Sequence, residues 1–484
     1  MNNYNDLRLK KPVKYGKITL IPSRIKGEYH MFTGLKNQLE LSDSLITNIL
    51  PKDNELVKLK KILNWEGINL IYKSCFNSTT GNKTKTTDIA LGLLLLKHLY
   101  KKSDRALINE LHLNNSYMYF CSLSYDAVAE ANRQGIKLID HSTIVKIRKR
   151  LGAEKIEKIL TLFTSELVKN KIIDGKYLFT DTTALEKNII YPTDVSLLSR
   201  VIRETDYIIQ NVIRKKNTVI SSAARKAKTL SKIYYSSSKK TKDLLNKTSK
   251  SLARIAKAQL IVAGVAANNM AGSISSVNIK RYKKLKEVGR KIVRQAENRI
   301  KGVKVRGRIL SYHEEHAKAL PKGKVGKLCE FGTKLSLSMS ANGYITDHKL
   351  YDSNIADVLT LKEAVSIHSK TFGKQFLGAA ADRAYYDQNL NNTLEKKHKI
   401  SLAIPHKKNR SALMGIDKDK LYNKRAAIEA KISEGKRMYG LNKSYYKGYD
   451  GDKMWAALGV MALNIRKLIR DINKNPELIL RFAG

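Results

Sequence analysis

Apolar residues in the first third of the chain recur at spacings of three and four positions, which is typical of amphipathic helices. The spacing is clear at Leu56, Leu59 and Leu63, and a run of apolar residues at 89–96 extends the pattern. Few strand or hairpin signals interrupt it. The pattern predicts an all-α domain over residues 35–155, preceded by an amino-terminal arm over residues 1–34.

Two serines in this region precede predicted helices. Ser103 and Ser142 are each expected to cap the helix that follows, because a serine hydroxyl accepts a hydrogen bond from a free backbone N–H at a helix start. The second helix carries a basic face, made of Lys146, Arg148, Lys149 and Arg150. This face is compatible with a helix-turn-helix that binds DNA, and equally with a packed bundle that has a solvated basic stripe.

The pattern changes to short runs of alternating and continuous apolar residues beyond position 175, which predicts strands. Residues 176–183 form a short apolar run that ends in an acid and hydroxyl residues, so a buried strand is expected with Asp181 at its end. Residues 330–340 and 344–351 predict an antiparallel pair, since Asn342 and Gly343 between them form a strong hairpin-turn dipeptide.

The remaining elements alternate between helices and strands. A helix is expected around residues 355–368, and then a strand at 376–381 that ends in Asp382. A polar helix, a short strand at 400–405 and a helix at 420–433 follow. The order predicts an α/β fold with a mixed sheet, interrupted by a long insertion after its first strand.

The insertion, residues 201–310, is rich in lysine and free of proline. It contains 28 Lys and Arg against 5 Asp and Glu, a larger excess than solubility requires, which favours contacts with phosphates over a merely solvated surface. The whole chain has 91 basic and 43 acidic residues, a net charge of +48. Such an excess indicates a polyanionic partner, nucleic acid before an anionic membrane.

Other classes of protein are not supported by the composition. No secretory or membrane-spanning stretch is visible, so a cytoplasmic protein is expected. The three cysteines form no CxxC pair, which argues against a zinc ribbon or a disulfide framework.

Three acids stand out against this background: Asp181 and Asp382 at predicted strand ends, and Glu429 on a predicted helix. Cleavage and transfer of phosphodiesters by two divalent cations requires several carboxylates that hold the cations. Magnesium prefers such oxygen ligands. Each acid alone is unremarkable, because most Asp and Glu residues lie on protein surfaces.

The surroundings of Glu429 are more specific. Tyr422, Arg425, Glu429 and Lys436 match in full the Tyr-Arg-Glu-Lys signature of a large group of bacterial insertion-sequence transposases of the DDE type. The chain resembles this group over about residues 35–470. Six further segments are similar to its motifs: NWEGI at 64–68, LLLLKHLY at 93–100, DHSTIVKIRKRLG at 140–152, DTTALEKNIIYPTD at 181–194, EFGTK at 330–334 and ADRAYYD at 381–387.

The resemblance implies a ribonuclease H-like core in which Asp181, Asp382 and Glu429 are the catalytic residues and hold two Mg²⁺ or Mn²⁺ ions. It implies that Tyr422, Arg425 and Lys436 contact DNA near the scissile phosphate. The domains expected are the arm, the helical DNA-binding domain, a core at 172–200 and 311–440, the insertion at 201–310, and a carboxy-terminal helical segment at 441–484.

Such an enzyme is expected to bind the inverted-repeat ends of its own element and join them to target DNA. A homodimer is expected on DNA, because two ends are held together. The carboxy-terminal helix around 453–472 is expected to add DNA contacts or a subunit interface. Two alternatives remain open: a nuclease of the same fold without strand transfer, and an inactive DNA-binding descendant.

Two other patterns are weaker. His313 and His316 enclose two glutamates, but HxxH is not the HExxH zinc motif, so this segment is expected to be structural or to face DNA. The glycines and lysines of residues 322–327 lack the spacing of a P-loop. No nucleoside triphosphate and no membrane partner are therefore expected.

Overall fold

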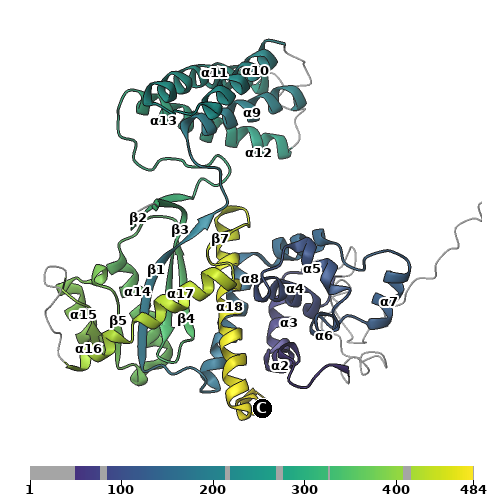
Figure 1. Ribbon diagram of the computed structural model, residues 1–484, viewed down its shortest axis with the longest axis vertical. Helices are drawn as coiled ribbons and strands as arrows, with labels where there is room; N and C mark the ends of the chain where they lie inside the picture. The colour runs from purple at the N-terminus through teal and green to yellow at the C-terminus, as the bar shows by residue number, and fades with distance from the viewer. Residues whose placement is uncertain are drawn as a thin grey trace, which may run out of the picture.

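The structure is a computed structural model that describes residues 49–76, 84–212, 218–268, 276–324, 327–406 and 416–482. The expected amino-terminal arm lies outside these residues. Figure 1 shows a helical amino-terminal domain, a sheet domain and a separate helical bundle, with one long helix between the first two. No helix of the described ranges has the length and apolar character needed to cross a membrane.

The amino-terminal domain is built around one helix that is buried along its whole length, α4 (Thr87–Leu99). The other helices of this domain are α2 (Glu55–Ile62), α3 (Trp65–Lys73), α5 (Asp104–Leu111), α6 (Asn115–Phe120), α7 (Tyr125–Arg133) and α8 (His141–Lys169). Gly152 has a φ of 65° and interrupts the helical geometry of α8. The apolar run that predicted a helix at 89–96 is therefore the centre of this domain.

One of the two expected caps is confirmed. The Ser103 hydroxyl accepts a hydrogen bond from the Ala106 backbone N–H at the start of α5. The expectation for Ser142 is wrong, because α8 begins one residue before it. Asp140 takes the cap position and accepts from the Ser142 N–H at 2.8 Å.

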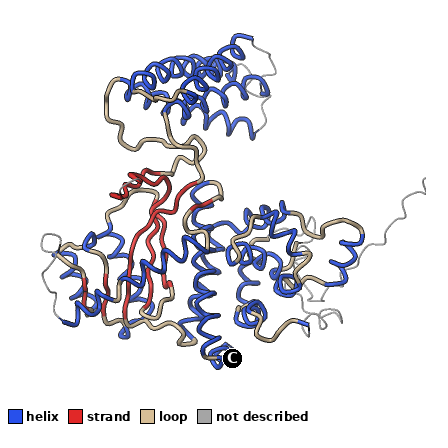
Figure 2. Tube along the Cα trace, in the orientation of Figure 1, coloured by secondary structure: helices blue, strands red, loops and turns tan. Residues whose placement is uncertain are grey.

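The sheet is mixed and has the strand order β2-β3-β1-β5-β6, with β4 beside β3 and β7 beside β1. Its strands are β1 (Tyr177–Lys187), β2 (Lys318–Lys324), β3 (Lys327–Ser340), β4 (Ile345–Tyr351), β5 (Gly378–Ala380), β6 (Ser401–Ala403) and β7 (Lys443–Ser444). Strand β3 is antiparallel to β1, β2 and β4, whereas β5, β6 and β7 run parallel to their partners. The expected mixed α/β character is confirmed (Figure 2).

The predicted hairpin between β3 and β4 is confirmed. Gly343 has a φ of 86°, a conformation that favours glycine, and its N–H donates to the Ser340 carbonyl at 3.0 Å. The Asn342 side chain donates to the Ile172 carbonyl at 2.7 Å, so the turn is also anchored to the end of the amino-terminal domain.

Helices accompany the sheet: α14 (Asp357–Phe372), α15 (Gln388–His398), α16 (Ile416–Asn423), α17 (Ala426–Met438) and α18 (Gly448–Lys474). Short helical turns occur at η2 (Gly373–Gln375), η3 (Arg383–Tyr385) and η4 (Pro476–Phe482). Both α14 and α17 contact β1, and α17 passes in front of the strands in Figure 1. The element order at 355–405 follows the predicted one.

Helix α18 lies between the amino-terminal domain and the sheet and contacts α4, α8 and β4. Most of its side chains are buried, and these residues join the amino-terminal domain and the sheet into one hydrophobic core. Its apolar faces are covered within the chain, so the helix joins the two domains. The expectation that it adds DNA contacts or a subunit interface stays a prediction.

The lysine-rich insertion folds into a helical bundle with its own hydrophobic core. Its helices are α9 (Asp194–Val212), α10 (Thr218–Ser236), α11 (Lys242–Asn268), α12 (Ser276–Lys284), the π-helical turn η1 (Leu285–Gly289) and α13 (Arg290–Ile300). The bundle begins at Asp194, before the boundary expected at residue 201. The Asp194 carboxylate anchors it through ion pairs with Arg299 and with Arg308, the latter at 2.9 Å.

Gly332 marks the closest approach of the central strands. It pairs with Glu186 of β1 on one side and with Lys318 of β2 on the other. A Cβ atom at this position would lie 2.0 Å from the Leu185 carbonyl oxygen, which is backbone and cannot move aside alone. The close pairing of β1 and β3 therefore requires glycine here.

We expect Gly332→Ala to lower the free energy of unfolding by at least about 1–3 kcal/mol, the range found for overpacked interiors. Equilibrium unfolding in urea measures the change. Gly264→Ala is the control, because the nearest atom to its added Cβ is the Tyr282 hydroxyl at 3.7 Å. Equal stability of the two variants would show that β1 and β3 can separate at little cost.

Candidate active site

Asp181 lies on β1, and Asp382 lies two residues beyond the end of the neighbouring strand β5. Phe179 of β1 pairs with Ala380 of β5 in parallel register, so the two aspartates each follow that pair by two residues. Asp181 lies inside β1, which continues to Lys187, and the prediction that it ends its strand is wrong. It is β5 that ends here, which leaves Asp382 at a strand end and opens space beside Asp181.

Glu429 lies in the first turn of α17. The single helix expected at 420–433 is two helices in the structure, because the chain turns at residues 424–425 between α16 and α17. Tyr422 therefore belongs to α16, while Arg425 occupies the position before α17. The Arg425 guanidinium lies over the Tyr422 ring at 5.3 Å.

The electrostatics of Asp181 connect the three acids. The pKa of Asp181 is raised to about 6: burial is the largest cause and the negative charges of Asp382 and Glu429 add to it, while the Thr182 N–H and Arg425 lower it. A carboxyl group perturbed by burial and by two other acids is typical of functional sites. The Asp181, Asp382 and Glu429 side chains therefore share one electrostatic environment.

Each of the three carboxylates has a partner within the chain. Asp181 accepts from the Thr182 N–H at 2.7 Å, Asp382 accepts from the Ala384 N–H at 2.9 Å, and Glu429 forms an ion pair with Arg425 at 2.7 Å. Within the described ranges, no three acidic, histidine or cysteine residues are close enough together to hold a metal ion. Carboxylates repel one another without a cation between them, so this separation is expected.

A second set of residues lies next to Asp181 and Thr182 of β1. The Thr182 hydroxyl donates to Asp357 at 2.8 Å, and Asp357 forms an ion pair with Lys334 at 2.7 Å. Tyr385 is buried, and its pKa is raised by burial first and then by the charges of Asp181 and Asp357. These residues hold β1, β3, α14 and η3 together around the aspartates.

The sequence analysis assigned no role to Tyr385, Lys334 or Asp357. Tyr385 and Lys334 lie in two of the segments that resemble transposase motifs, so their positions were already marked. Asp357 carried no such signal. Its role becomes visible only when α14 packs against β1 and brings its first turn to Thr182.

The basic residues of α8 do not share one environment. Lys146, Lys149 and Arg150 are exposed, with Arg150 over the Phe76 ring at 4.8 Å. Arg148 points into the chain, where its guanidinium lies 3.8 Å from the centre of the Tyr446 ring and its side chain is only 14% exposed. Lys436, from α17, is half-buried.

The HxxH segment takes part in a buried group of charges that we call the Lys187 cluster: Lys187, Glu314, His316 and Asp452. The Lys187 ammonium lies 2.6 Å from Asp452 and 3.2 Å from Glu314, and His316 lies 2.7 Å from Asp452. Lys187 and Asp452 are almost completely buried. The cluster connects the end of β1, the segment returning from the bundle and the start of α18, which is a structural role.

Comparisons with known proteins point in one direction. Residues 44–150 match a family described as "Transposase domain (DUF772)", and residues 386–469 match one described as "Transposase DDE domain". A protein of Rhizobium meliloti described as "Uncharacterized protein ORF8 in nfe locus" is 26% identical over 171 residues, which cover 35% of this chain and 78% of that protein. No solved structure matches the chain.

The two family matches are independent of each other. The first covers the helical amino-terminal domain, and the second includes Glu429, α17 and most of α18. The chain therefore contains two transposase domains, which indicate a DNA transposase.

Proposed function

We propose that the protein is an insertion-sequence transposase that cuts and joins DNA at a ribonuclease H-like site formed by Asp181, Asp382 and Glu429. The observation that carries the proposal is the placement of the three acids on β1, just beyond β5 and on α17, and the raised pKa of Asp181, whose causes include both other acids, supports it. The adjacency of β1 and β5 and the position of Glu429 on a helix beside them support a core of this type. The Tyr-Arg-Glu-Lys spacing supports membership of that subgroup.

The acids fit a pair of Mg²⁺ or Mn²⁺ ions chemically. All three offer carboxylate oxygens, the donors that these cations prefer, and Arg425 now supplies the positive charge beside Glu429. Two such ions would activate the attacking oxygen and stabilise the leaving oxygen of the phosphodiester. Asp181, Asp382 and Glu429 would hold them.

The residues around Glu429 would position the DNA. If Glu429 held a cation, its ion pair with Arg425 would weaken, and the guanidinium would be free to donate two hydrogen bonds to the scissile phosphate. Tyr422 and Lys436 would contact the backbone on either side. Asp357 would hold Thr182 in place through their hydrogen bond, and the buried Tyr385 would hold Asp181 from the neighbouring turn η3.

The reaction would proceed in two steps at the same site. Water attacks the phosphodiester at each element end and releases a 3′-hydroxyl group. That hydroxyl then attacks target DNA, forms one phosphodiester and breaks another, with the target 3′-oxygen as leaving group. The number of phosphodiesters is unchanged in the second step, so no nucleoside triphosphate is needed.

End recognition would fall to the amino-terminal domain. Lys146, Lys149 and Arg150 of α8 are exposed and available to phosphates. Arg148, which was also a candidate, would act indirectly, since it packs on Tyr446. The two element ends would be held by a homodimer on the DNA.

The test is a cleavage and joining assay with the full chain, a labelled DNA end fragment and a target plasmid in Mg²⁺. We expect the wild type to give nicked and joined products and Glu429→Gln to give neither, because the amide replaces a charged ligand. Glu154→Gln, at an exposed position of α8, is the matched control and should behave like the wild type.

The alternatives predict different products. Cleavage without joining would favour a nuclease of the same fold. Binding of the DNA without cleavage by any variant would favour an inactive DNA-binding descendant. Activity that survives in Glu429→Gln would remove this residue from the site.

A further inference from the structure

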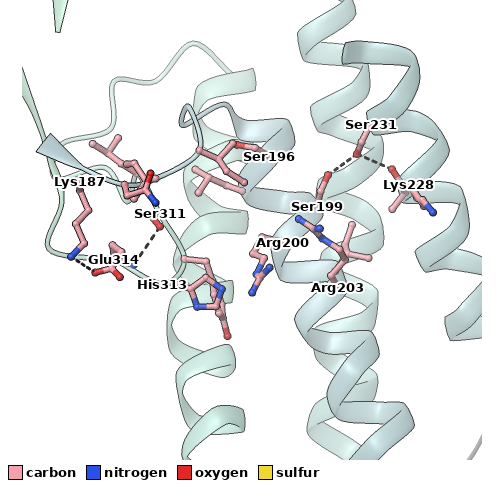
Figure 3. Close-up of a pocket in the computed structure, with 18 of the residues that line it drawn as sticks. Lys187, Ser196, Ser199, Arg200, Arg203, Lys228, Ser231, Ser311, His313 and Glu314 are labelled. Atoms are coloured by element: carbon pink, nitrogen blue, oxygen red, sulfur yellow. Dashed lines mark hydrogen bonds and ion pairs between the residues drawn. The ribbon is translucent and has the colours of Figure 1, made fainter. Parts of the chain in front are cut away.

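A cavity of about 1240 Å³ lies where the helical bundle meets the sheet domain. Helices α9 and α10 form one wall, and the segments 187–190, 310–314 and 444–447 form the other. Figure 3 shows Arg200, Arg203 and Lys228 on the bundle side, and Lys187 and Glu314 on the opposite side. The three acids of the candidate active site do not line this cavity.

The lining carries more positive charge than its acids neutralise. Arg203, Arg225, Lys228 and Lys447 line the cavity, are exposed, and form no ion pair with an acidic residue of the described ranges. One acid of the lining, Asp206, accepts a hydrogen bond from Gln210 at 2.8 Å. The other, Glu314, belongs to the buried Lys187 cluster, so both acids already have partners within the chain.

The pKa of His313, at the cavity wall, shows the effect of the positive charges around it. Its pKa is lowered by burial first, and then by the positive charges of Arg200, Lys284 and Lys447, against the opposing charge of Glu204. Cations on the bundle and on the core segment thus act on the same ring. Positive charge therefore faces the cavity from both of its walls.

Strand β1 connects this cavity to the candidate active site. Asp181 and Lys187 lie on the same strand at positions of equal parity, so their side chains leave β1 on the same face. Six residues of strand span about 20 Å. A DNA strand carries a phosphate about every 3.4 Å, so a strand that is bound at Asp181 reaches the cavity within about six nucleotides.

We propose that this cavity is a binding site for the sugar–phosphate backbone of duplex DNA that flanks the position of cleavage. The inference rests on the proposed function, because it takes DNA as the substrate. Arg203, Arg225 and Lys228 supply charge-assisted hydrogen bonds to phosphates. The hydroxyls of Ser199 and Ser231 lie 2.6 Å apart and link α9 to α10 beside these cations.

The test compares two triple variants of equal charge change in full-length protein. The cavity variant is Arg203→Gln, Arg225→Gln and Lys228→Gln. The control variant removes three exposed lysines of the same bundle that do not line the cavity: Lys226→Gln, Lys232→Gln and Lys250→Gln. Affinity for a random-sequence DNA duplex is measured over a range of salt concentrations without a divalent cation.

We expect the slope of log Kd against log salt concentration to fall by about 3 in the cavity variant, since each lost phosphate contact removes about 0.9. The control variant should change it by less than about 1. Chemical acetylation gives a second measurement that needs no substitution: DNA should protect Lys228 but leave Lys226 reactive.

Equal slopes in the two variants, or equal reactivity of Lys228 with and without DNA, would overturn the inference. Because binding is measured without cleavage, the two proposals fail separately. If the protein joins DNA but the cavity and control variants have equal slopes, only the proposed cavity site is overturned. A protein that shows the difference in slope but never cleaves DNA loses the transposase function and keeps the site.

Discussion

Asp181→Asn is expected to lower the rate of DNA cleavage at least about a thousand-fold, which corresponds to roughly 4 kcal/mol of transition-state stabilisation. The reason is that the proposed site loses one of its three carboxylates, which the neutral amide does not replace. Single-turnover cleavage of an end fragment in Mg²⁺ measures the effect. DNA binding should be nearly unchanged, because Asp181 is half-buried and repels phosphates rather than attracting them.

The same substitution is expected to stabilise the metal-free protein. Asp181 has a pKa of about 6 in the folded chain, above its ordinary value of 3.8. The folded state therefore holds the proton more tightly than the unfolded state, and stability falls as pH rises from 3.8 to about 6. Above that window the ionised carboxylate costs up to about 3 kcal/mol, which asparagine removes.

Equilibrium unfolding at several pH values in the presence of a chelator tests whether Asp181→Asn stabilises the protein. The gain in stability of Asp181→Asn should be largest near about pH 8 and nearly absent near about pH 4, where the wild-type carboxyl is also neutral. Asp243→Asn, at an exposed position of α11, should show no such dependence. A variant that loses both activity and stability at neutral pH would show that Asp181 is held by favourable contacts rather than strained.

The second large effect concerns the Lys187 cluster. Asp452→Ala is expected to lower the free energy of unfolding by about 3–5 kcal/mol, because it leaves the buried Lys187 ammonium with too little negative charge around it. The side chains of Lys187 and Asp452 are 2% and 1% exposed, so water cannot replace the lost partner. Thermal unfolding of the full chain measures the loss.

Asp450→Ala is the matched control for this prediction. It changes the same residue type two positions earlier in α18, where the carboxylate is 79% exposed and lies 3.8 Å from Lys453. Surface ion pairs of this kind contribute less than about 1 kcal/mol. If both variants unfold at the same temperature, the Lys187 cluster does not hold β1 and α18 together.

Much of the fold follows from local patterns. The hairpin at Asn342 and Gly343, the helix at 89–96 and the order of elements at 355–405 depend on turn chemistry and periodicity, which act over a few residues. The position of α18 does not. Its apolar residues predict a helix, but only the packing of two distant domains decides that most of that helix is buried.

The candidate site also has some features that local sequence patterns predict and others that depend on long-range packing. Asp181, Asp382 and Glu429 were identified from motifs, and the raised pKa of Asp181 is consistent with their proximity. The turn between α16 and α17 was missed, because residues 424–425 contain neither glycine nor proline to mark it. Arg148 was misjudged as one of four equivalent cations, since its contact with Tyr446 joins residues that are 298 positions apart.

The pairing of Gly332 has a consequence for the ancestry of this chain. The helical bundle leaves the sheet after Glu186 and Lys187 and returns at Lys318, and both ends lie beside the same residue of β3. Two strand spacings, about 10 Å, separate them, a gap that a few residues can span. A change in the bundle between these two ends would therefore not require a change in the pairing of β1, β3 and β2. Related chains can carry different insertions at this point and keep the same sheet.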